Sequence, residues 1–439
     1  MKILAVDFGS TYTKVSAIEK VVIGTAKAFT TIETDIRDGL NAALAELEKQ
    51  TGKLDFDAKL ASSSAGGGLK MVAVGLVPSL TAKAALLAAE SAGAKVVKTY
   101  AYELAPAEQE EIFGIKPDLV LLSGGTDGGN KEAVLHNAKK LAEIEGDFAV
   151  IAAGNKTVQS DVARILEGAG KHTVTVRNVM PALGQLDIMP AKEAIRSLFM
   201  ERIVEAKGLG EAAKMMSLPI VPTPLAVLWA AELLATEIGS LVAVDIGGAT
   251  TDVYSITEGA TTRRGVIQKG LPEPYAKRSV EGDLGMRYSL GSLIGAEPKN
   301  EGCDAFLAKC IQDPSYVPKP GSDDAAMDAA LCAKAARIAI NRHSGSLERV
   351  FTPMGETYYQ TGKDLTNVKH IVGIGGAIVY ADSPGRILQT ALAGDDPLCL
   401  LPKAPGFLFD KKYIFAAMGL LSQTNKELAV KIMQREVLP

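Results

Sequence analysis

Residues 245–252, with the sequence Asp-Ile-Gly-Gly-Ala-Thr-Thr-Asp, carry side chains that suit a metal-bound phosphate. A short apolar run precedes them, so a strand is expected to lead into a glycine turn whose amides donate to phosphate oxygens. Thr250 and Thr251 add hydroxyl donors. The carboxylates of Asp245 and Asp252 would repel phosphate unless a cation lay between, so the pattern predicts Mg2+ together with a nucleotide. Taken alone, the same residues also suit a plain β-hairpin with a Gly-Gly turn.

Residues 7–14, Asp-Phe-Gly-Ser-Thr-Tyr-Thr-Lys, repeat this order near the N-terminus, between apolar strands predicted at residues 3–6 and 15–18. Two such hairpins far apart in the sequence predict two related lobes, each of which offers a phosphate-binding turn to one cleft. Lys14 can neutralise phosphate charge, although a lone lysine at the start of a strand is as often simply solvated.

The composition of the 439-residue chain favours an α/β protein of two to four domains. Hydrophobic residues make up 47% and aromatic residues only 5%, and 43 glycines imply many turns between strands and helices. A net charge of -4 gives no electrostatic reason to bind nucleic acid or an anionic membrane. The four cysteines form no CxxC pair, and no apolar run is long enough for a signal peptide or a membrane span. We therefore expect a cytoplasmic protein with reduced thiols that contacts neither nucleic acid nor membrane.

Besides the two hairpins, the sequence predicts a helix before the second hairpin and a third glycine turn after it. Pro222-Thr223-Pro224 begins a helix that is predicted to run to about residue 236, just before the second glycine hairpin. A strand at residues 368–372 enters Gly375-Gly376-Ala377, and a helix is predicted at residues 411–421. These four elements, in this order, resemble the actin, Hsp70 and sugar-kinase superfamily. The resemblance implies a two-lobed actin-like (ribonuclease-H-like) ATPase with two phosphate loops, a connecting helix and an adenosine loop.

The resemblance also implies roles for single residues. Asp7 and Asp245 would hold Mg2+ through waters, and ATP or ADP would be the nucleotide. The expected contacts to phosphate are Gly9, Ser10, Thr11, Thr13, Lys14, Gly247, Gly248, Thr250 and Thr251, and those to the nucleoside are Gly375, Gly376 and Ala377. Hsp70-type chaperones carry a glutamate just before the Pro-Thr of the connecting helix, where this chain has Val221. Hydrolysis would therefore be slow or use Asp7, Asp245 or Asp252 as the catalytic carboxylate.

The segment between residues 67 and 180 alternates predicted strands and helices, which indicates an inserted, doubly wound, flavodoxin-like domain with a parallel sheet. Its strands are expected at residues 70–77, 95–100, 118–122, 148–152 and 173–178. The first lobe would then comprise residues 1–66 and 181–238, and the second lobe residues 239–439. The glycine-rich loops at residues 123–129 and 153–155 either form a small-molecule pocket or only let strands turn into helices.

The inserted segment resembles the cobalamin-binding subunit of carbon-skeleton mutases, on the strand Lys-Pro-Asp-Leu-Val-Leu-Leu-Ser and the Ala-Gly-Asn that follows the next strand. That family gives a histidine to cobalt from an Asp-x-His-x-x-Gly loop. The corresponding loop here, residues 78–83, contains neither Asp nor His. We therefore expect a domain that imitates the cobalamin subunit in shape and does not ligate cobalt through histidine.

Gly-Gly-Thr-Asp-Gly-Gly-Asn and Val-Glu-Gly-Asp-Leu-Gly-Met-Arg, within an actin-type ATPase that carries such an insertion, resemble the GlmL/MutL family. Its members are accessory proteins of adenosylcobalamin-dependent methylaspartate (glutamate) mutase. The resemblance implies a nucleotide-driven, chaperone-like reactivating factor whose partners are the mutase subunits. A small-molecule kinase is the main alternative, since Asp245 suits a catalytic base, and a filament-forming actin relative is another. An activator of 2-hydroxyacyl-CoA dehydratases is disfavoured, because the four cysteines lie away from the nucleotide motifs.

Overall fold

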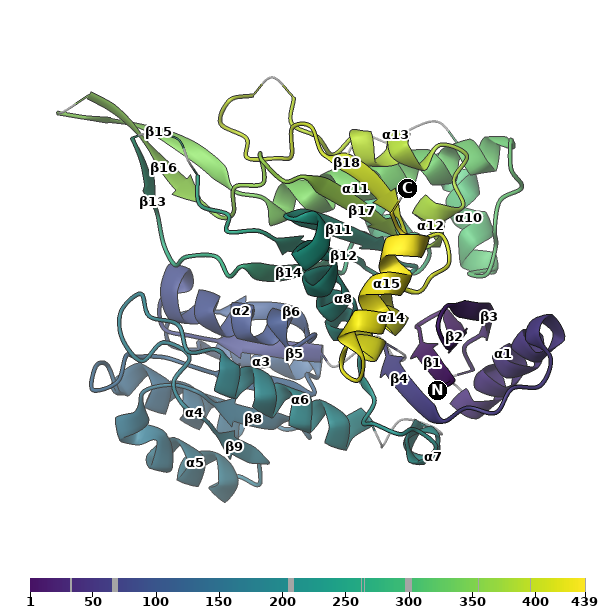
Figure 1. Ribbon diagram of the computed structural model, residues 1–439. Helices are drawn as coiled ribbons and strands as arrows, with labels where there is room; N and C mark the ends of the chain where they lie inside the picture. Colours follow the sequence, from purple (N-terminus) through teal and green to yellow (C-terminus); the bar gives the residue numbers. More distant parts are fainter. Residues whose placement is uncertain are drawn as a thin grey trace. The chain divides into compact units, whose positions relative to one another are not determined.

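The computed structural model describes the chain except residues 32–33, 65–69, 204–208, 262, 264, 297–301, 354, 395 and 439; the side chains of residues 200 and 203 are also left out (Figure 1). The chain forms two compact units. Unit 1 comprises residues 1–66, 206–269 and 273–439, and unit 2 comprises residues 67–205 together with Gly270–Pro272.

The first lobe of unit 1 is built on a five-stranded mixed sheet. Its strands are β1 (Ile3–Phe8), β2 (Tyr12–Ile18), β3 (Val22–Phe29), β4 (Ala58–Ser63) and β10 (Val221–Pro222), in the order β10-β4-β1-β2-β3. The first three strands form an antiparallel meander, and β4 and β10 add to β1 in parallel. Helices α1 (Ile36–Thr51) and α7 (Leu209–Lys214) belong to this lobe.

The second lobe repeats this sheet. Its strands are β11 (Leu241–Ile246), β12 (Thr251–Ile256), β14 (Ala276–Glu281), β17 (His370–Ile374) and β18 (Gly406–Phe409), in the order β14-β12-β11-β17-β18. Here too the first three strands form an antiparallel meander and the last two add in parallel. The duplicated topology confirms the predicted two-lobed actin-like architecture, and each glycine hairpin joins the first two strands of its sheet.

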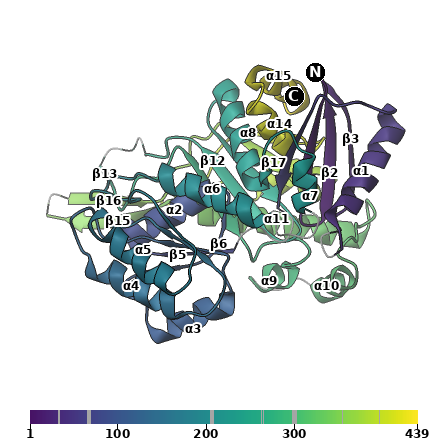
Figure 2. The ribbon, with the colours of Figure 1, turned by 90° about the horizontal axis from the view of Figure 1, so that it is seen from below.

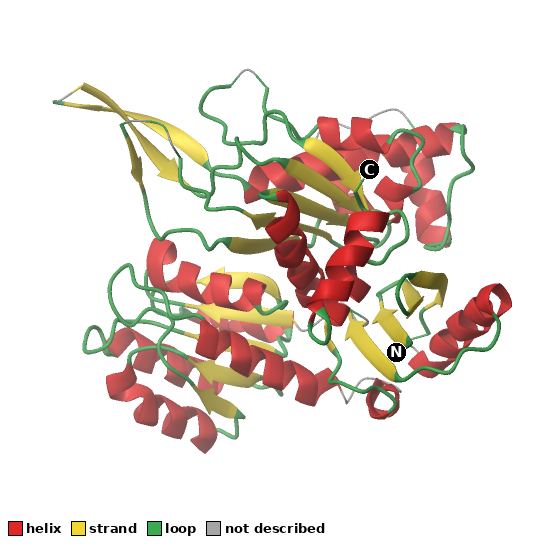
Figure 3. Cartoon of the chain, viewed as in Figure 1, coloured by secondary structure: helices red, strands yellow, loops and turns green. Residues whose placement is uncertain are grey.

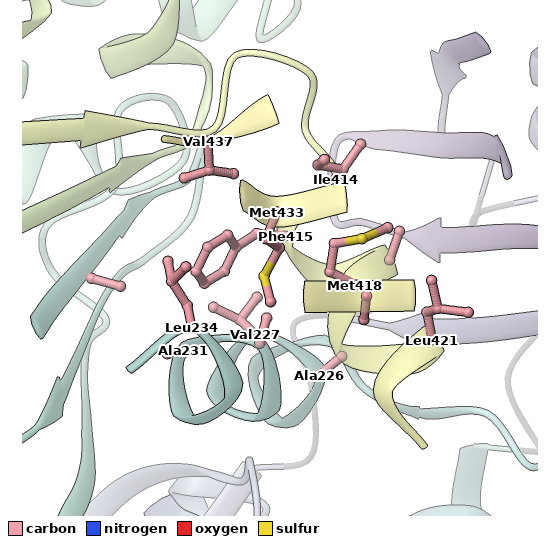
Figure 4. Packing of buried hydrophobic residues seen from close by; sticks show 14 of the residues in the cluster. Ala226, Val227, Ala231, Leu234, Ile414, Phe415, Met418, Leu421, Met433 and Val437 are labelled. Atoms are coloured by element: carbon pink, nitrogen blue, oxygen red, sulfur yellow. The ribbon is translucent and has the colours of Figure 1, made fainter. Parts of the chain in front are cut away.

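Two helices pack tightly between the sheets of unit 1. They are α8 (Thr223–Ile238) and α14 (Phe415–Ser422), and α15 (Lys426–Glu436) packs beside them. Figure 4 shows Val227 and Leu234 of α8 against Phe415 and Met418 of α14. A Cβ atom at Gly419 would lie 1.8 Å from the carbonyl oxygen of Ala226, so only glycine allows this approach.

Helix α14 begins later than the sequence predicted. The predicted helix at residues 411–421 starts at Phe415, because the buried carboxylate of Asp410 caps it by accepting from the amides of Ile414 (2.9 Å) and Phe415 (2.8 Å). Tyr413, with φ of 53°, makes the turn between cap and helix.

The remaining helices of the second lobe are α9 (Leu290–Gly295), α10 (Cys303–Gln312), α11 (Asp323–His343), α12 (Gly376–Val379) and α13 (Pro384–Gln389). A three-stranded sheet of β13 (Val266–Gln268), β16 (Gly355–Thr361) and β15 (Ser346–Thr352) extends from this lobe as a ribbon (Figure 1). The sequence analysis did not predict this ribbon.

Unit 2 is a parallel α/β domain. Its strands are β5 (Lys70–Val74), β6 (Lys95–Tyr100), β7 (Leu119–Leu122), β8 (Ala149–Ala152) and β9 (Thr173–Thr175), in the order β6-β5-β7-β8-β9. This is the flavodoxin-like order 2-1-3-4-5. Helices α2 (Lys83–Ser91) and α6 (Met189–Ile203) cover one face, and α3 (Pro106–Ile115), α4 (Glu132–Glu143) and α5 (Gln159–Gly168) cover the other (Figures 2 and 3).

One predicted boundary was wrong. We expected residues 181–205 in the first lobe, but they belong to unit 2. The reason is that Ala191, Ile195 and Leu198 of α6 are buried in the core that α2 and the sheet of unit 2 form.

Candidate functional site

The first hairpin holds Asp7 in a fixed orientation. In the sheet, Asp7 lies opposite Lys14 of β2 and Ser62 of β4. Its Oδ1 accepts from the hydroxyls of Thr223 (2.6 Å) and Ser62 (3.1 Å), and its Oδ2 accepts from the Lys14 ammonium (3.2 Å). Thr223 is the first residue of α8, so the connecting helix begins at the carboxylate that is expected to hold the metal.

Thr13 does not face the position expected for phosphate. It is fully buried, and its hydroxyl lies 3.1 Å from that of Thr30, which donates to the carbonyl of Gly9 (2.9 Å). The amide of Gly9 donates to the carbonyl of Tyr12 (3.2 Å), and a Cβ at Gly9 would lie 2.6 Å from that oxygen. Thr13 and Thr30 therefore brace the loop from behind, which corrects the expectation for Thr13.

The second hairpin has the same construction. The amide of Gly247 donates to the carbonyl of Thr250 (2.9 Å), which closes the turn. Thr251 is fully buried, and its hydroxyl donates to the carbonyl of Leu284 (2.6 Å). The Thr251 hydroxyl therefore stabilises the turn from behind and is not free to donate to phosphate. This corrects the expectation for Thr251, as for Thr13 above.

Asp252 has a partner that the sequence did not reveal. The guanidinium of Arg278, on β14, donates to its Oδ1 at 2.6 and 2.8 Å, and the hydroxyl of Thr250 donates to its Oδ2 (3.1 Å). Both members of the ion pair are buried. Because Arg278 and Thr250 already engage both carboxylate oxygens, the structure argues against Asp252 as the catalytic carboxylate.

Asp245 and Lys14 belong to one electrostatic cluster. Burial raises the pKa of Asp245 to about 7, an effect that the charge of Lys14 opposes and the charges of Asp252 and Asp7 strengthen. Burial alone would lower the pKa of Lys14, but Asp7, Asp245 and the buried carboxyl group of Asp410 raise it. The two hairpins therefore lie close enough for Lys14 to interact with an aspartate from each.

The loops themselves also meet. The Oγ1 atom of Thr11 lies 3.0 Å from the position that a Cβ at Gly248 would take. This hydroxyl is buried and has no hydrogen-bond partner among the described residues. The amides of Met286 and Arg287 donate to the carbonyls of Gly247 (3.0 Å) and Gly248 (2.8 Å). The loop at residues 282–288 thus forms the floor of the second hairpin.

The third glycine turn packs against the second hairpin. Gly375 has φ of 93°, and a Cβ there would lie 2.3 Å from the carbonyl oxygen of Ile246, the last residue of β11. A Cβ at Gly376 would lie 2.6 Å from the hydroxyl of Tyr413. Ala377 follows in the short helix α12, partly buried at the edge of the core of the second lobe.

Lysine and tyrosine side chains surround this turn, and of these the sequence analysis identified only Lys14. The ammonium of Lys14 lies 5.2 Å from the centre of the Tyr413 ring. The ammonium of Lys27 lies 4.9 Å from the Tyr380 ring and 5.1 Å from the Tyr12 ring. These cation–π contacts join β2 and β3 of the first lobe to the loops of the second. A signal was available, because Tyr12, Lys14 and Lys27 lie on one face of neighbouring strands.

The site fits a magnesium nucleotide. At Gly9, Gly375 and Gly376 a Cβ atom would collide with neighbouring backbone or side-chain atoms. The Thr11 hydroxyl lacks a hydrogen-bond partner among the described residues. Within the described ranges, no group of three or more His, Cys, Asp or Glu side chains is placed so that it could hold a metal ion by itself. Mg2+ is usually bound by one or two carboxylates, with phosphate oxygens and waters as its other ligands. The two aspartates match this arrangement and do not suit a metal that protein side chains hold alone.

The strand-end loops of unit 2 are closed by their own hydrogen bonds. Asn155 is buried, accepts from the amide of Gly128 (3.1 Å) and donates to the carbonyls of Gly129 and Asn130 (both 3.1 Å). Asn178 is also buried and donates to the carbonyl of Gly125 (2.9 Å). Of the two readings of these loops, the structure favours the one in which glycines only permit tight turns.

Comparisons with known proteins identify the family. The sequence matches the family described as MutL protein over residues 3–437. The chain belongs to this family. Protein MutL from Clostridium tetanomorphum is 46% identical over 457 residues, which cover 98% of each chain. The predicted resemblance is therefore confirmed over the whole chain.

Solved structures also match the chain, among them a carboxylase and a dehydratase component. Acetone carboxylase in a nucleotide-free structure is 13% identical with a TM-score of 0.41, and the match covers 96% of this chain and 70% of that one. Component A of (R)-2-hydroxyglutaryl-CoA dehydratase from Acidaminococcus fermentans is 10% identical with a TM-score of 0.32, covering 98% and 99%. Within the described part of the chain, no helix combines the length and apolar composition needed to cross a bilayer.

Proposed function

We propose that this protein binds and slowly hydrolyses Mg2+-ATP, and that it uses the resulting lobe motion to reactivate or assemble an adenosylcobalamin-dependent mutase, glutamate mutase by family resemblance. The observation that carries the nucleotide part is the meeting of the two duplicated hairpins, where the Oγ1 atom of Thr11 lies 3.0 Å from the position of a Cβ at Gly248 and Lys14 pairs with Asp7. Membership of the MutL family supports the accessory role.

Different residues would bind the metal and the phosphates of the nucleotide. Asp7 and Asp245 would hold Mg2+ through waters, and the metal would supply the positive charge that lets phosphate lie between two carboxylates. Backbone amides of the glycine turns other than those of Gly9 and Gly247, which close the turns, and the hydroxyl of Thr11 would donate to phosphate oxygens. Lys14 would neutralise phosphate charge in exchange for part of its contact with Asp7.

A structural route connects this site to lobe motion. Thr223 donates to Asp7 at 2.6 Å and is the first residue of α8, so a change at Asp7 acts directly on the start of that helix. Helix α8 is packed against α14 through the close approach at Gly419. Occupied and empty sites would then favour different angles between lobes, which is how hinged ATPases transmit binding.

Unit 2 is the proposed contact for the mutase. Its flavodoxin-like strand order is that expected for a domain that imitates a cobalamin-binding subunit. The loop that would carry a cobalt-binding histidine is a π-helical turn at Pro78–Ala82, and a Cβ at Gly75 would lie 2.3 Å from the amide nitrogen of Ala82. A domain of this shape without that histidine can compete for the surface on which the cobalamin subunit docks.

The proposal is tested with purified protein and inactivated glutamate mutase. We expect mutase activity to return with free adenosylcobalamin and ATP, but not with ADP, and Asp245→Asn to abolish the effect. Gly291→Ala, at an open position of α9 in the same lobe, serves as the matched control. Transfer of phosphate to a small acceptor, without any effect on the mutase, would instead identify a kinase of this superfamily.

A further inference from the structure

Three residues of the second lobe's sequence belong to the other unit. Gly270–Pro272 lie between β13 and β14, yet they are part of unit 2. Leu271 is only 4% exposed and lies in the core that α2 and α6 form with the sheet, whereas Lys269, Gly270 and Pro272 are exposed. A single buried leucine in an exposed segment acts as an anchor.

The chain on the N-terminal side of this anchor is fixed to unit 1. Strand β13 pairs in parallel with β16, and the amide of Lys269 donates to the carbonyl of Gln360 (2.8 Å). The ammonium of Lys269 also pairs with Glu348 of β15 (3.1 Å). No free residue therefore separates the ribbon sheet of unit 1 from Gly270.

The chain on the C-terminal side is fixed more firmly. The fully buried ammonium of Lys363 donates to the carbonyls of Pro274 (2.8 Å), Tyr275 (2.7 Å) and Ser255 (3.1 Å). An ion pair joins Glu273 to Lys277 at 3.2 Å, with side chains that are 3% and 10% exposed. Burying such charges is costly, and here they fix the chain within two residues of Pro272.

From this fixed point, one strand leads to the candidate nucleotide site. Strand β14 is paired with β12 over its whole length, from Ala276 opposite Ile256 to Glu281 opposite Thr251. The loop that follows donates backbone amides to the carbonyls of Gly247 and Gly248. A displacement of the second hairpin therefore moves the floor loop and β14 as one piece, because a fully paired strand does not stretch.

We infer that Gly270–Pro272 form a tether that transmits the nucleotide state of unit 1 to unit 2. The tether connects unit 2 to the second lobe at both of its ends, whereas the two ends of the insertion connect unit 2 to the first lobe. This inference rests on the proposed ATP site. Movement of β14 shifts Leu271 within the core below α2 and α6, and so changes the packing of these helices.

Hydrogen exchange on the full-length protein, with and without Mg2+-ATP, tests the tether. The decisive variant inserts Gly-Ser-Gly-Ser between Pro272 and Glu273, on the side of the anchor that leads to β14, which slackens the tether and leaves Leu271 available to its core. The matched control inserts the same residues after Gly321, an exposed glycine with open space around it. Leu271→Met, which keeps an apolar anchor, is the second control.

In the native protein and both controls, ATP is expected to change exchange both at residues 245–252 and in α2 and α6, by about twofold or more. The slackened variant is expected to keep the response at residues 245–252 and its ATP affinity, and to lose the response in α2 and α6. The tether is refuted if the slackened variant still responds in α2 and α6, or if the native protein responds only at residues 245–252. Absence of any response at residues 245–252 would refute the ATP site itself.

Discussion

Gly375→Ala places a methyl group where two independent constraints forbid it. The backbone of Gly375 has φ of 93° and ψ of 151°, a conformation that costs residues other than glycine about 1–3 kcal/mol. The new Cβ would also lie 2.3 Å from the carbonyl oxygen of Ile246, against an ordinary contact of about 3.5 Å. Relieving this overlap by moving β11 adds about 1–3 kcal/mol, as overpacking does elsewhere.

We expect this substitution to lower the free energy of unfolding by about 2–6 kcal/mol, the sum of the two costs, measured in urea. The shift of β11 also displaces the second hairpin, so ATP affinity measured by calorimetry should fall about tenfold or more, since each tenfold change corresponds to about 1.4 kcal/mol. The matched control is Gly291→Ala, where a Cβ meets nothing within 4 Å and which lies in helix α9. It should leave ATP affinity unchanged and stabilise slightly. A Gly375→Ala protein with native stability and native affinity would refute this account of the third turn.

Three further substitutions separate structural roles from binding roles. Thr11→Val should leave stability within about 0.5 kcal/mol and lower ATP affinity about tenfold, because its hydroxyl has no partner in the described structure; Thr13→Val should cost about 1–2 kcal/mol of stability, because its hydroxyl braces the loop. Stability is measured by urea unfolding and ATP affinity by calorimetry. A loss of stability in Thr11→Val and a loss of ATP affinity in Thr13→Val would contradict these assignments. Asp252→Asn should destabilise by about 3 kcal/mol through the buried Arg278, and a loss of ATP hydrolysis without a loss of stability would instead make Asp252 catalytic. Native labelling with a thiol reagent should modify Cys399 and spare the cysteines that are buried, since burial raises the pKa of Cys332 and Cys310; rapid labelling of all four would contradict this packing.

The duplicated architecture could be predicted from the sequence because each lobe begins with the same short local pattern. An apolar run, an aspartate, a glycine turn and a cluster of hydroxyl groups occur together in residues 3–14 and again in residues 241–252. The parallel sheet of unit 2 was predictable for a similar reason, since its strands are short apolar runs between helices. Backbone conformation and local periodicity determine such features, and both can be recognised in a single sequence.

To predict the side-chain roles at the site, one also needs to know which face of the sheet each residue points to and which strands are neighbours. Thr13 lies next to Lys14 in an extended strand, so the two point to opposite faces, and the same rule separates Thr251 from Asp252. Applying that alternation would have predicted that neither threonine faces the cleft. The ion pair between Asp252 and Arg278 could not be predicted, because it depends on which strand lies beside β12 and on the register of the two strands.

The late start of α14 and the position of α6 depend on contacts between distant parts of the chain. Asp410 directly follows β18 and caps the next helix, which a hydrophobic pattern at residues 411–421 does not reveal. Helix α6 follows the last strand of unit 2 without a marked change in composition, so only its burial under α2 assigns it.

Calorimetric titration of ATP in the presence and absence of Mg2+ tests the central claim most directly. We expect binding to one site per chain that requires Mg2+ and is lost in both Asp7→Asn and Asp245→Asn, because each lobe contributes one of the two carboxylates. Binding that is independent of Mg2+, or that survives either substitution unchanged, would contradict a site formed jointly by the two hairpins.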